Sequence, residues 1–213
     1  GGKGQRRPAS RAARQHGADL VLYSATKYLG GFSDIIGGVA LARDPQILQP
    51  LRALRAMFGN IMQPDECWIL DSRLPTVNLR MNRQSKNAQR IAEALNGHPK
   101  LLTVHYPTLF DDPEQQRIFS AQCDFPGGMF SVELKGGKHA AFEFLRHLRI
   151  ARNAVSLGGV ETLVCHPKTT THSGFTPEAW EIAGITDGLV RVSVGIEDWR
   201  DLLADFQQAL DAA

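Results

Sequence analysis

A single lysine, Lys27, stands between a strand-like run and a cluster of glycines in VLYSATKYLGGFSDIIGG, residues 21–38. A lysine amine acts as a nucleophile only when it is neutral, and burial or a nearby cation favours that state. The end of a buried strand offers burial, and the hydroxyls of Ser24 and Thr26 suit the acceptor oxygens of a phosphate. A lysine beside such hydroxyls and a glycine-rich loop is what a pyridoxal-phosphate Schiff base needs. An S-x-T-K run also occurs by chance, so the spacing alone leaves a plain surface lysine as the alternative.

An arginine lies within an alternating strand, LVRVSV, residues 189–194. Because Val190, Val192 and Val194 share one face, Arg191 and Ser193 share the other. An arginine in the inner part of a strand needs an anionic partner, and the fork of its guanidinium fits a substrate carboxylate. The alternative is a structural ion pair with an acidic residue, which the pattern alone favours.

A serine, Ser156, is followed by Leu157-Gly158-Gly159, where backbone amides could be exposed. Ser156 could hydrogen-bond an anion at such a place. The alternative is an ordinary turn serine, and the residues alone favour it.

The histidines and cysteines predict no metal site. His166 and His172 flank a threonine run at a spacing that fits no common metal signature, so we expect core or turn histidines. Cys67, Cys123 and Cys165 lie far apart, and their odd number without a CxxC pair argues against a disulfide framework or a zinc site. This cysteine usage predicts a reducing, cytoplasmic setting.

The composition is that of an ordinary globular chain of 213 residues, with 43% hydrophobic and 22% charged residues. No apolar run reaches the length of a transmembrane helix, so no membrane partner is predicted. Residues 1–15 contain five basic residues and no acidic ones, but they lack the apolar core of a secretory signal. We expect residues 1–16 to be a disordered or unrelated segment, and nucleic-acid binding there is the weakest hypothesis because no aromatic residue accompanies the charges.

The first part of the chain must position Lys27. Residues 18–26 and 35–42 read as two buried strands on either side of the loop KYLGGFSD, followed by a helix from Pro45 to about Met57. A long helical stretch from Pro64 to Asn96 should be kinked or split at Pro75.

The second part alternates strands and helices. A strand that stops at Pro107 is predicted at 101–106. Two more are predicted at 129–134 and 189–194, where the apolar residues recur at every second position. Helices are predicted after Lys138, from Thr176-Pro177, and over the last residues of the chain.

Three segments together resemble one family. They are SATKYLGG…SDIIGG, AVSLGGVETLVCHPKTTTHSG and VRVSVGIEDWRDLLADFQQAL. They are similar to the motifs of the Cys/Met-metabolism pyridoxal-phosphate enzymes, a group of cystathionine γ-synthases, cystathionine lyases, methionine γ-lyases and O-acylhomoserine sulfhydrylases. They occur in the family's order with similar gaps, and the resemblance covers residues 17–213.

The resemblance implies a role for each matching residue. Lys27 would form the Schiff base with pyridoxal 5′-phosphate and move protons at the substrate's α and β carbons. Ser24 and Thr26 would contact the phosphate. Ser156 and Arg191 would hold the substrate's α-carboxylate and so fix the α C–H bond relative to the cofactor ring.

The residue before Ser156 bears on the substrate. Family members that handle cystathionine tend to have a glutamate there, whereas this chain has Val155. An apolar residue suits a thioether end, so we expect methionine γ-lyase-like C–S cleavage that releases a thiol, a 2-oxo acid and ammonia. A γ-replacement of the cystathionine γ-synthase or O-acylhomoserine sulfhydrylase type is the alternative.

The chain departs from the family in several places. Family members are about twice as long and have an aspartate for the pyridinium nitrogen, but counting back from Lys27 reaches Gly2 with no aspartate nearby. Phe32 stands where a histidine is common, and Pro75 interrupts a segment that is usually helical. A second hypothesis is therefore a non-catalytic fragment or pseudo-enzyme that keeps only a scaffold and an oligomer surface.

The resemblance implies the type I pyridoxal-phosphate, aminotransferase-like α/β fold. Residues 1–75 would form the last part of a cofactor-binding domain with a mostly parallel sheet. Residues 76–213 would form a smaller α/β domain with an antiparallel sheet. The expected partners are a small amino-acid substrate and other copies of the chain, in a homotetramer built as a dimer of dimers.

Overall fold

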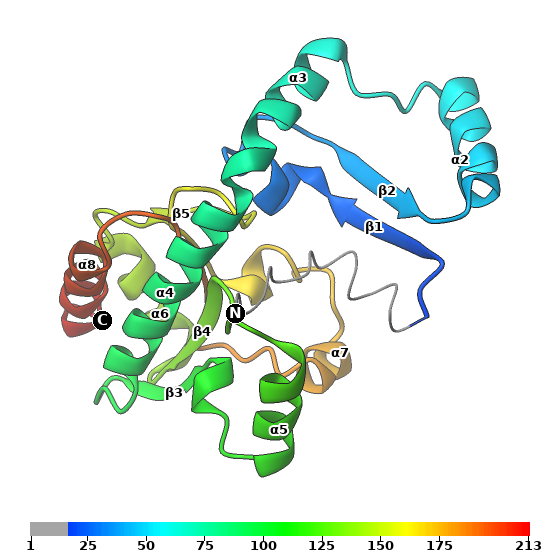
Figure 1. Cartoon of the computed structure of the whole chain (residues 1–213). Helices are drawn as coiled ribbons and strands as arrows, with labels where there is room; N and C mark the ends of the chain where they lie inside the picture. The colour runs from blue at the N-terminus through cyan, green and yellow to red at the C-terminus, as the bar shows by residue number, and fades with distance from the viewer. Residues whose placement is uncertain (1–16) are drawn as a thin grey trace, which may run out of the picture.

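The computed structural model describes residues 17–213, so the prediction for residues 1–16 lies outside the described part. A layered α/β body contains most of the chain, and a hairpin with two helices projects from it (Figure 1). The long helix α4 (Val77–Leu95) runs from the projecting part into the body. None of the helices within residues 17–213 is both long and apolar enough to cross a membrane.

The projecting part starts with two strands, β1 (Leu20–Ser24) and β2 (Gly38–Ala42). They pair antiparallel, with Leu22 opposite Ala40, and they make a sheet of their own. The expectation of two buried strands in a mostly parallel sheet is therefore wrong for the described residues. Leu22 is 70% exposed, because no further strand or helix of the described chain covers that face.

Three elements lead from this hairpin to the body. Helix α2 (Pro45–Phe58) begins at the N-cap Asp44, whose side chain accepts a hydrogen bond from the amide of Gln46. Helix α3 (Pro64–Arg73) is separated from α4 by a short 3-10 turn, η2 (Leu74–Thr76). The predicted division at Pro75 is thus observed, and its cause is that proline cannot donate an intrahelical hydrogen bond.

The body is built on a five-stranded sheet in the order β3-β4-β7-β6-β5. The strands are β3 (Leu101–His105), β4 (Met129–Leu134), β5 (Arg152–Asn153), β6 (Leu163–Cys165) and β7 (Leu189–Ser193). All neighbours pair antiparallel except β5 and β6, which are parallel. The prediction of an antiparallel sheet is confirmed apart from this edge pair.

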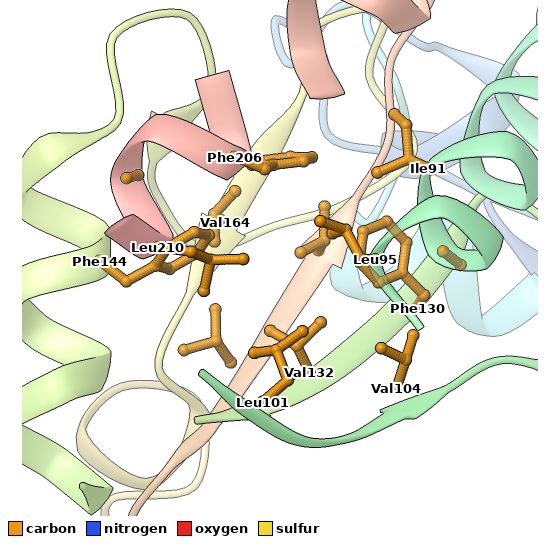
Figure 2. Packing of buried hydrophobic residues seen from close by; sticks show 14 of the residues in the cluster. Ile91, Leu95, Leu101, Val104, Phe130, Val132, Phe144, Val164, Phe206 and Leu210 are labelled. Carbon is orange, nitrogen blue, oxygen red and sulfur yellow. The ribbon is translucent and has the colours of Figure 1, made fainter. Parts of the chain in front are cut away.

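The other helices of the body lie between these strands and after the last of them in the sequence. They are α5 (Pro113–Gln122), α6 (Gly137–His147), α7 (Pro177–Ile182) and α8 (Trp199–Asp211), with short 3-10 turns η3 (Pro107–Leu109) and η4 (Pro167–Thr169). The core lies where α4, α6 and α8 pack on one face of the sheet, and Figure 2 shows Ile91, Phe130 and Phe206 within it. Val190, Val192 and Val194 are buried in this core, so Arg191 and Ser193 point to the opposite face, as the alternation predicted.

A buried carboxylate fixes α8 to the segment that follows α6. Asp205 is almost fully buried and accepts hydrogen bonds from the amides of Arg149, Ile150 and Ala151, at 2.8, 2.9 and 3.0 Å. Without the carboxylate all three amides would lose this acceptor, and the buried amide of Ala151 would have no solvent to replace it.

We therefore expect Asp205→Ala to lower the free energy of unfolding by about 2–3 kcal/mol. Urea denaturation followed by circular dichroism measures this change. Gln207→Ala, at an exposed position of the same helix, is the matched control and should stay within about 0.5 kcal/mol of the wild type. Equal effects of the two substitutions would contradict the assigned role.

Candidate active site

Three polar side chains from distant parts of the sequence meet at the junction of the hairpin and the body. The amine of Lys27 lies 3.4 Å from the hydroxyl of Ser156, to which it donates a hydrogen bond. The guanidinium of Arg191 donates from Nη2 to the backbone carbonyl of Ser156, at 2.7 Å. Because these residues are separated by 129 and 35 positions, their meeting is a product of the fold.

Lys27 sits in η1 (Ala25–Leu29), a single π-type turn directly after β1. Its own dihedral angles, φ −93° and ψ −126°, are not helical and break the turn in two. The segment is fixed before the lysine by Gly37, whose carbonyl accepts from the amides of Ala25 and Thr26 at 2.8 and 3.2 Å. It is fixed after the lysine by the amide of Gly31, which donates to the carbonyl of Lys27 at 2.7 Å.

The two predicted phosphate contacts differ in their surroundings. Thr26 uses its hydroxyl within the protein, where Oγ1 donates to the carbonyl of Gly37 at 3.3 Å and accepts from its amide at 3.0 Å. Ser24 is exposed at the end of β1, and its side chain does not cap the turn. The hydroxyl of Ser24 is therefore open to solvent, whereas that of Thr26 joins the Lys27 turn to the residue just before β2.

Ser156 lies in the connection between β5 and β6. Its φ of 91° is in the left-handed region that a serine rarely adopts, which is a strained backbone. Two residues on, the amide of Gly158 donates to the hydroxyl of Ser193 at 3.0 Å. The sequence led us to expect exposed amides after Ser156, but this one is buried and used within the protein.

Arg191 is half-buried on β7, between Ser131 of β4 and Cys165 of β6. Its Nε is buried without a hydrogen-bond partner, and no acidic residue in the described chain forms an ion pair with it. A buried donor of a charged fork that lacks a partner is costly unless a ligand anion satisfies it. The structural ion pair, which the pattern alone favoured, is thus not formed within residues 17–213.

A phenol lies beside these groups. Burial raises the pKa of the Tyr28 hydroxyl above its ordinary value, and the positive charge of Arg191 opposes part of this rise. Tyr28 therefore remains a neutral phenol at physiological pH. Its backbone amide follows Lys27 directly, so the ring and the lysine amine belong to the same short turn.

The Lys27 segment and the Ser156 segment pack backbone against backbone. The amide of Val160 donates to the carbonyl of Gly31 at 2.9 Å. A Cβ atom at Gly158 would lie 2.7 Å from the amide nitrogen of Tyr28 and 3.1 Å from the carbonyl carbon of Lys27. The approach is therefore close enough that only a glycine fits at position 158.

We expect Gly158→Ala to lower the free energy of unfolding by about 2–4 kcal/mol, from left-handed strain and from overlap with the Lys27 segment. Gly97→Ala is the matched control, because both glycines have a φ of 82° and nothing lies within 4 Å of a Cβ at Gly97. That control should cost only the strain of about 1–2 kcal/mol. Urea unfolding of both variants measures the difference. Equal losses of free energy of unfolding would mean that the backbone around Gly158 can accommodate a methyl group.

The structure adds two residues that the sequence did not single out. Arg80 and Gln84 lie one turn apart on the buried face of α4, ahead of its buried apolar residues. Arg80 donates to the carbonyls of Tyr28 and Leu29, and Gln84 donates to the carbonyl of Gly159. Their signal in the sequence is polar residues at i and i+4 spacing in line with the apolar stripe of Ala88, Ile91 and Leu95.

The remaining candidates have structural roles. His166 is buried, and its ring nitrogens contact Thr169 Oγ1 and the carbonyl of Asp187, both at 2.9 Å. His172 lies in a turn, with its ring edge to face against Phe175. Within residues 17–213, no group of three or more His, Cys, Asp and Glu side chains could hold a metal ion.

Comparison with known proteins adds a family match. The family model of the Cys/Met metabolism PLP-dependent enzymes matches residues 7–211. That match begins ten residues before Gly17, where the resemblance read from the three motifs begins.

Individual relatives give the same result. Over 198 residues, the chain is 45% identical to an L-methionine γ-lyase of Pseudomonas putida, a match covering 92% of this chain and 50% of that protein. It is 44% identical to an L-methionine γ-lyase of Fusobacterium nucleatum subsp. nucleatum, with 92% and 49% covered. The crystal structure of a cystathionine γ-synthase from Xanthomonas oryzae pv. oryzae superposes with a TM-score of 0.88 at 40% identity, covering 93% of this chain and 51% of that one. The chain thus spans about half the length of the relatives it matches.

Proposed function

The chain belongs to the Cys/Met metabolism PLP-dependent enzymes, and from this premise we propose that it forms part of a methionine γ-lyase-like enzyme that cleaves a C–S bond. The observation that carries the proposal is the meeting of Lys27, Ser156 and Arg191 at one place. A lysine amine, a hydroxyl and an unsatisfied guanidinium donor form a set that suits a cofactor aldehyde and an amino-acid carboxylate.

The residues present fit pyridoxal phosphate. When bound, this cofactor supplies an electron sink for the α-carbon of an amino acid. We assign the Lys27 amine to the aldehyde end of the cofactor, and the hydroxyls of Ser24 and Thr26 to its phosphate. The fit rests on the amine of Lys27, whose one hydrogen bond of 3.4 Å is long, and on the buried, unpartnered Nε of Arg191.

The substrate's α-carboxylate is assigned to Arg191 and Ser156. Nη2 of Arg191 is occupied by the carbonyl of Ser156, which leaves Nε and the rest of the fork for an anion. A carboxylate held there is oriented beside the Lys27 amine, because Ser156 contacts both Lys27 and Arg191. Lys27 can then move a proton at the α-carbon and at the β-carbon from one position.

The substrate's distal end is assigned to a thioether. Val155 is a half-exposed apolar side chain next to Ser156, and an apolar neighbour favours the thioether of methionine over a second amino-acid group. The two relatives described above are named methionine γ-lyases, which supports the same choice.

A γ-replacement is the second candidate function. It is supported by the superposition on a protein named cystathionine γ-synthase, because both reactions use one fold and one lysine. A third candidate is a scaffold without catalysis, supported by the absence of an aspartate before Lys27 at the family's usual spacing.

The experiment is to incubate the chain with pyridoxal phosphate, reduce with borohydride and locate the added mass by peptide mapping. We expect one pyridoxyl group, on Lys27, accompanied by a visible absorbance band that reduction removes. Lys86, which is exposed on α4, is the internal comparison and should stay unmodified. Label spread evenly over the exposed lysines would reject the cofactor role and favour the non-catalytic scaffold.

A second measurement separates the two reactions. Thiol release from methionine without added thiol is expected of a lyase. Conversion of O-acetylhomoserine only when a thiol is supplied would instead identify a γ-replacement enzyme.

We also propose a domain division, an oligomeric state and a location for the chain. Residues 1–75 would belong to the cofactor-binding domain and 76–213 to the small domain, which is supported by separate hydrophobic clusters around Ile35 and around Phe206. A homo-oligomer, as a dimer of dimers, is supported by exposed apolar side chains such as Phe58 and Trp68. A cytoplasmic location is supported by three cysteines without disulfides.

A further inference from the structure

We propose that Arg80 is a positioning residue for Lys27 and holds the turn that carries the lysine amine in its place beside Ser156. The inference rests on the function proposed for Lys27. Arg80 lies on α4 and is only 5% exposed. Its Nη1 donates to the carbonyl of Tyr28 at 2.7 Å, and its Nη2 donates to the carbonyl of Leu29 at 3.1 Å. One guanidinium thus binds two consecutive carbonyls immediately after Lys27.

The charge of Arg80 has no acidic partner. Its third donor, Nε, bonds to the hydroxyl of Thr76 at 3.0 Å, and no carboxylate in residues 17–213 forms an ion pair with it. Burial lowers the pKa of Arg80, and the nearby charge of Arg73 lowers it further. A buried cation with only neutral acceptors is a poor way to stabilise a fold. The planar guanidinium instead fixes the orientation of the two backbone carbonyls that it binds.

The backbone that follows the Lys27 turn packs in direct contact with the guanidinium of Arg80. Gly31 has a φ of +76°, and a Cβ there would lie 2.1 Å from Nη1 of Arg80. The carbonyl of Gly31 accepts from the amide of Val160, which belongs to the segment leading away from Ser156. A shift of the guanidinium would therefore displace both the segment that contains Lys27 and the segment that contains Ser156.

The same face of α4 also holds the segment after Ser156. Gln84, four residues after Arg80, donates to the carbonyl of Gly159 at 2.6 Å. Asn87 donates to the carbonyls of Gly195 and Glu197 at 3.2 and 2.8 Å. Residues at this spacing lie on one side of a helix, so α4 is a common frame for three segments. Among these contacts, Arg80 is the one that reaches the Lys27 turn.

Loss of Arg80 should loosen one end of this turn. Its start remains fixed by the two hydrogen bonds to Gly37, and the amide of Gly31 still donates to the carbonyl of Lys27. The carbonyls of Tyr28 and Leu29, however, lose the donor that holds them to α4. We therefore expect the lysine amine to leave Ser156 while the rest of the fold persists. A general loss of stability would instead affect all half-buried lysines alike.

The test is competitive trace labelling of lysine amines with acetic anhydride on the 213-residue chain, read by peptide mass. In Arg80→Met, which fills the buried space without a fork, Lys27 should label about 5–10 times faster than in the wild type. Lys168 is the internal control, because its side chain is 23% exposed and pairs with Asp187 rather than with a residue of the turn. Arg83→Ala, at an exposed position of the same helix, is the matched variant and should leave Lys27 unchanged.

A second variant keeps the test decisive. Arg80→Lys retains the charge but can bind only one carbonyl well, so Lys27 should label about two to three times faster than in the wild type. If Arg80→Met fails to fold, this variant decides. An unchanged rate at Lys27, or an equal rise at Lys168, would overturn the proposal. The labelling needs no cofactor, so it remains readable if pyridoxal phosphate does not attach to wild-type Lys27, a result that would count against the proposed function alone.

Discussion

Replacing Lys27 by alanine should abolish both the attachment of pyridoxal phosphate and the release of thiol from methionine. The expected fall in rate is at least about 10³-fold, because general acid–base catalysis alone contributes 10²–10⁴-fold and the attachment is lost as well. The neighbouring hydroxyl of Ser156 cannot replace the amine, since it is far less basic and does not form the same bond to an aldehyde. Thiol release followed with a chromogenic disulfide measures the change.

The fold should not depend on this lysine. Its amine makes one long hydrogen bond, to Ser156 at 3.4 Å, so we expect the free energy of unfolding of Lys27→Ala to stay within about 1 kcal/mol of the wild type. Lys86→Ala, at an exposed position, is the control and should retain the cofactor and the rate. Retention of thiol release in Lys27→Ala would rule out the lysine chemistry, whatever the state of the fold.

The sequence predicted the helices and strands after Pro75 well because their signals are local. Alternation in residues 189–194 placed the valines of β7 in the core and Arg191 on the other face. Pro75 marked the break between α3 and α4, because a proline acts on its own turn. Thr176 marked the start of α7 as an N-cap, and its hydroxyl accepts from the amide of Ala179.

The hairpin was predicted poorly for a physical reason. Apolar runs such as ADLVLYSAT indicate a strand that is buried on both faces, but burial depends on what packs against it. In residues 17–213, β1 has only β2 as its partner, and Leu22 and Ile36 remain exposed. The apolar pattern of the strand therefore indicates that its surface can be buried. Within residues 17–213, no further strand or helix covers that surface.

The candidate site was predicted only in part. The motif residues Lys27, Ser156 and Arg191 were named from the sequence, and the structure brings them together. Arg80 was missed because an arginine on a helix is usually exposed, and its one local signal, the i and i+4 spacing with Gln84 in line with the apolar stripe, does not show what the guanidinium binds. Its role comes from contacts 51 and 52 residues away, which no local pattern contains.

Replacing Arg191 by alanine should weaken binding of methionine about 10²–10⁴-fold, the loss expected for two charge-assisted hydrogen bonds of about 1.5–3 kcal/mol each. The same change should hardly affect methioninamide, which has no carboxylate for the fork to bind. The measurement is the ratio of the two dissociation constants, by competition in the absorbance or in the thiol assay. This ratio cancels any loss of folded protein, because both ligands meet the same preparation.

Arg191→Lys separates charge from geometry. An ammonium keeps the positive charge but cannot form two parallel hydrogen bonds to one carboxylate, so we expect an intermediate loss of about 10-fold for methionine. Arg191 also holds the carbonyl of Ser156, whose strained φ of 91° depends on support from its neighbours. If Arg191 acted only through Ser156, both substitutions would weaken methionine and methioninamide equally. A preference for the carboxylate that persists in Arg191→Ala would therefore assign the substrate's anion to another group.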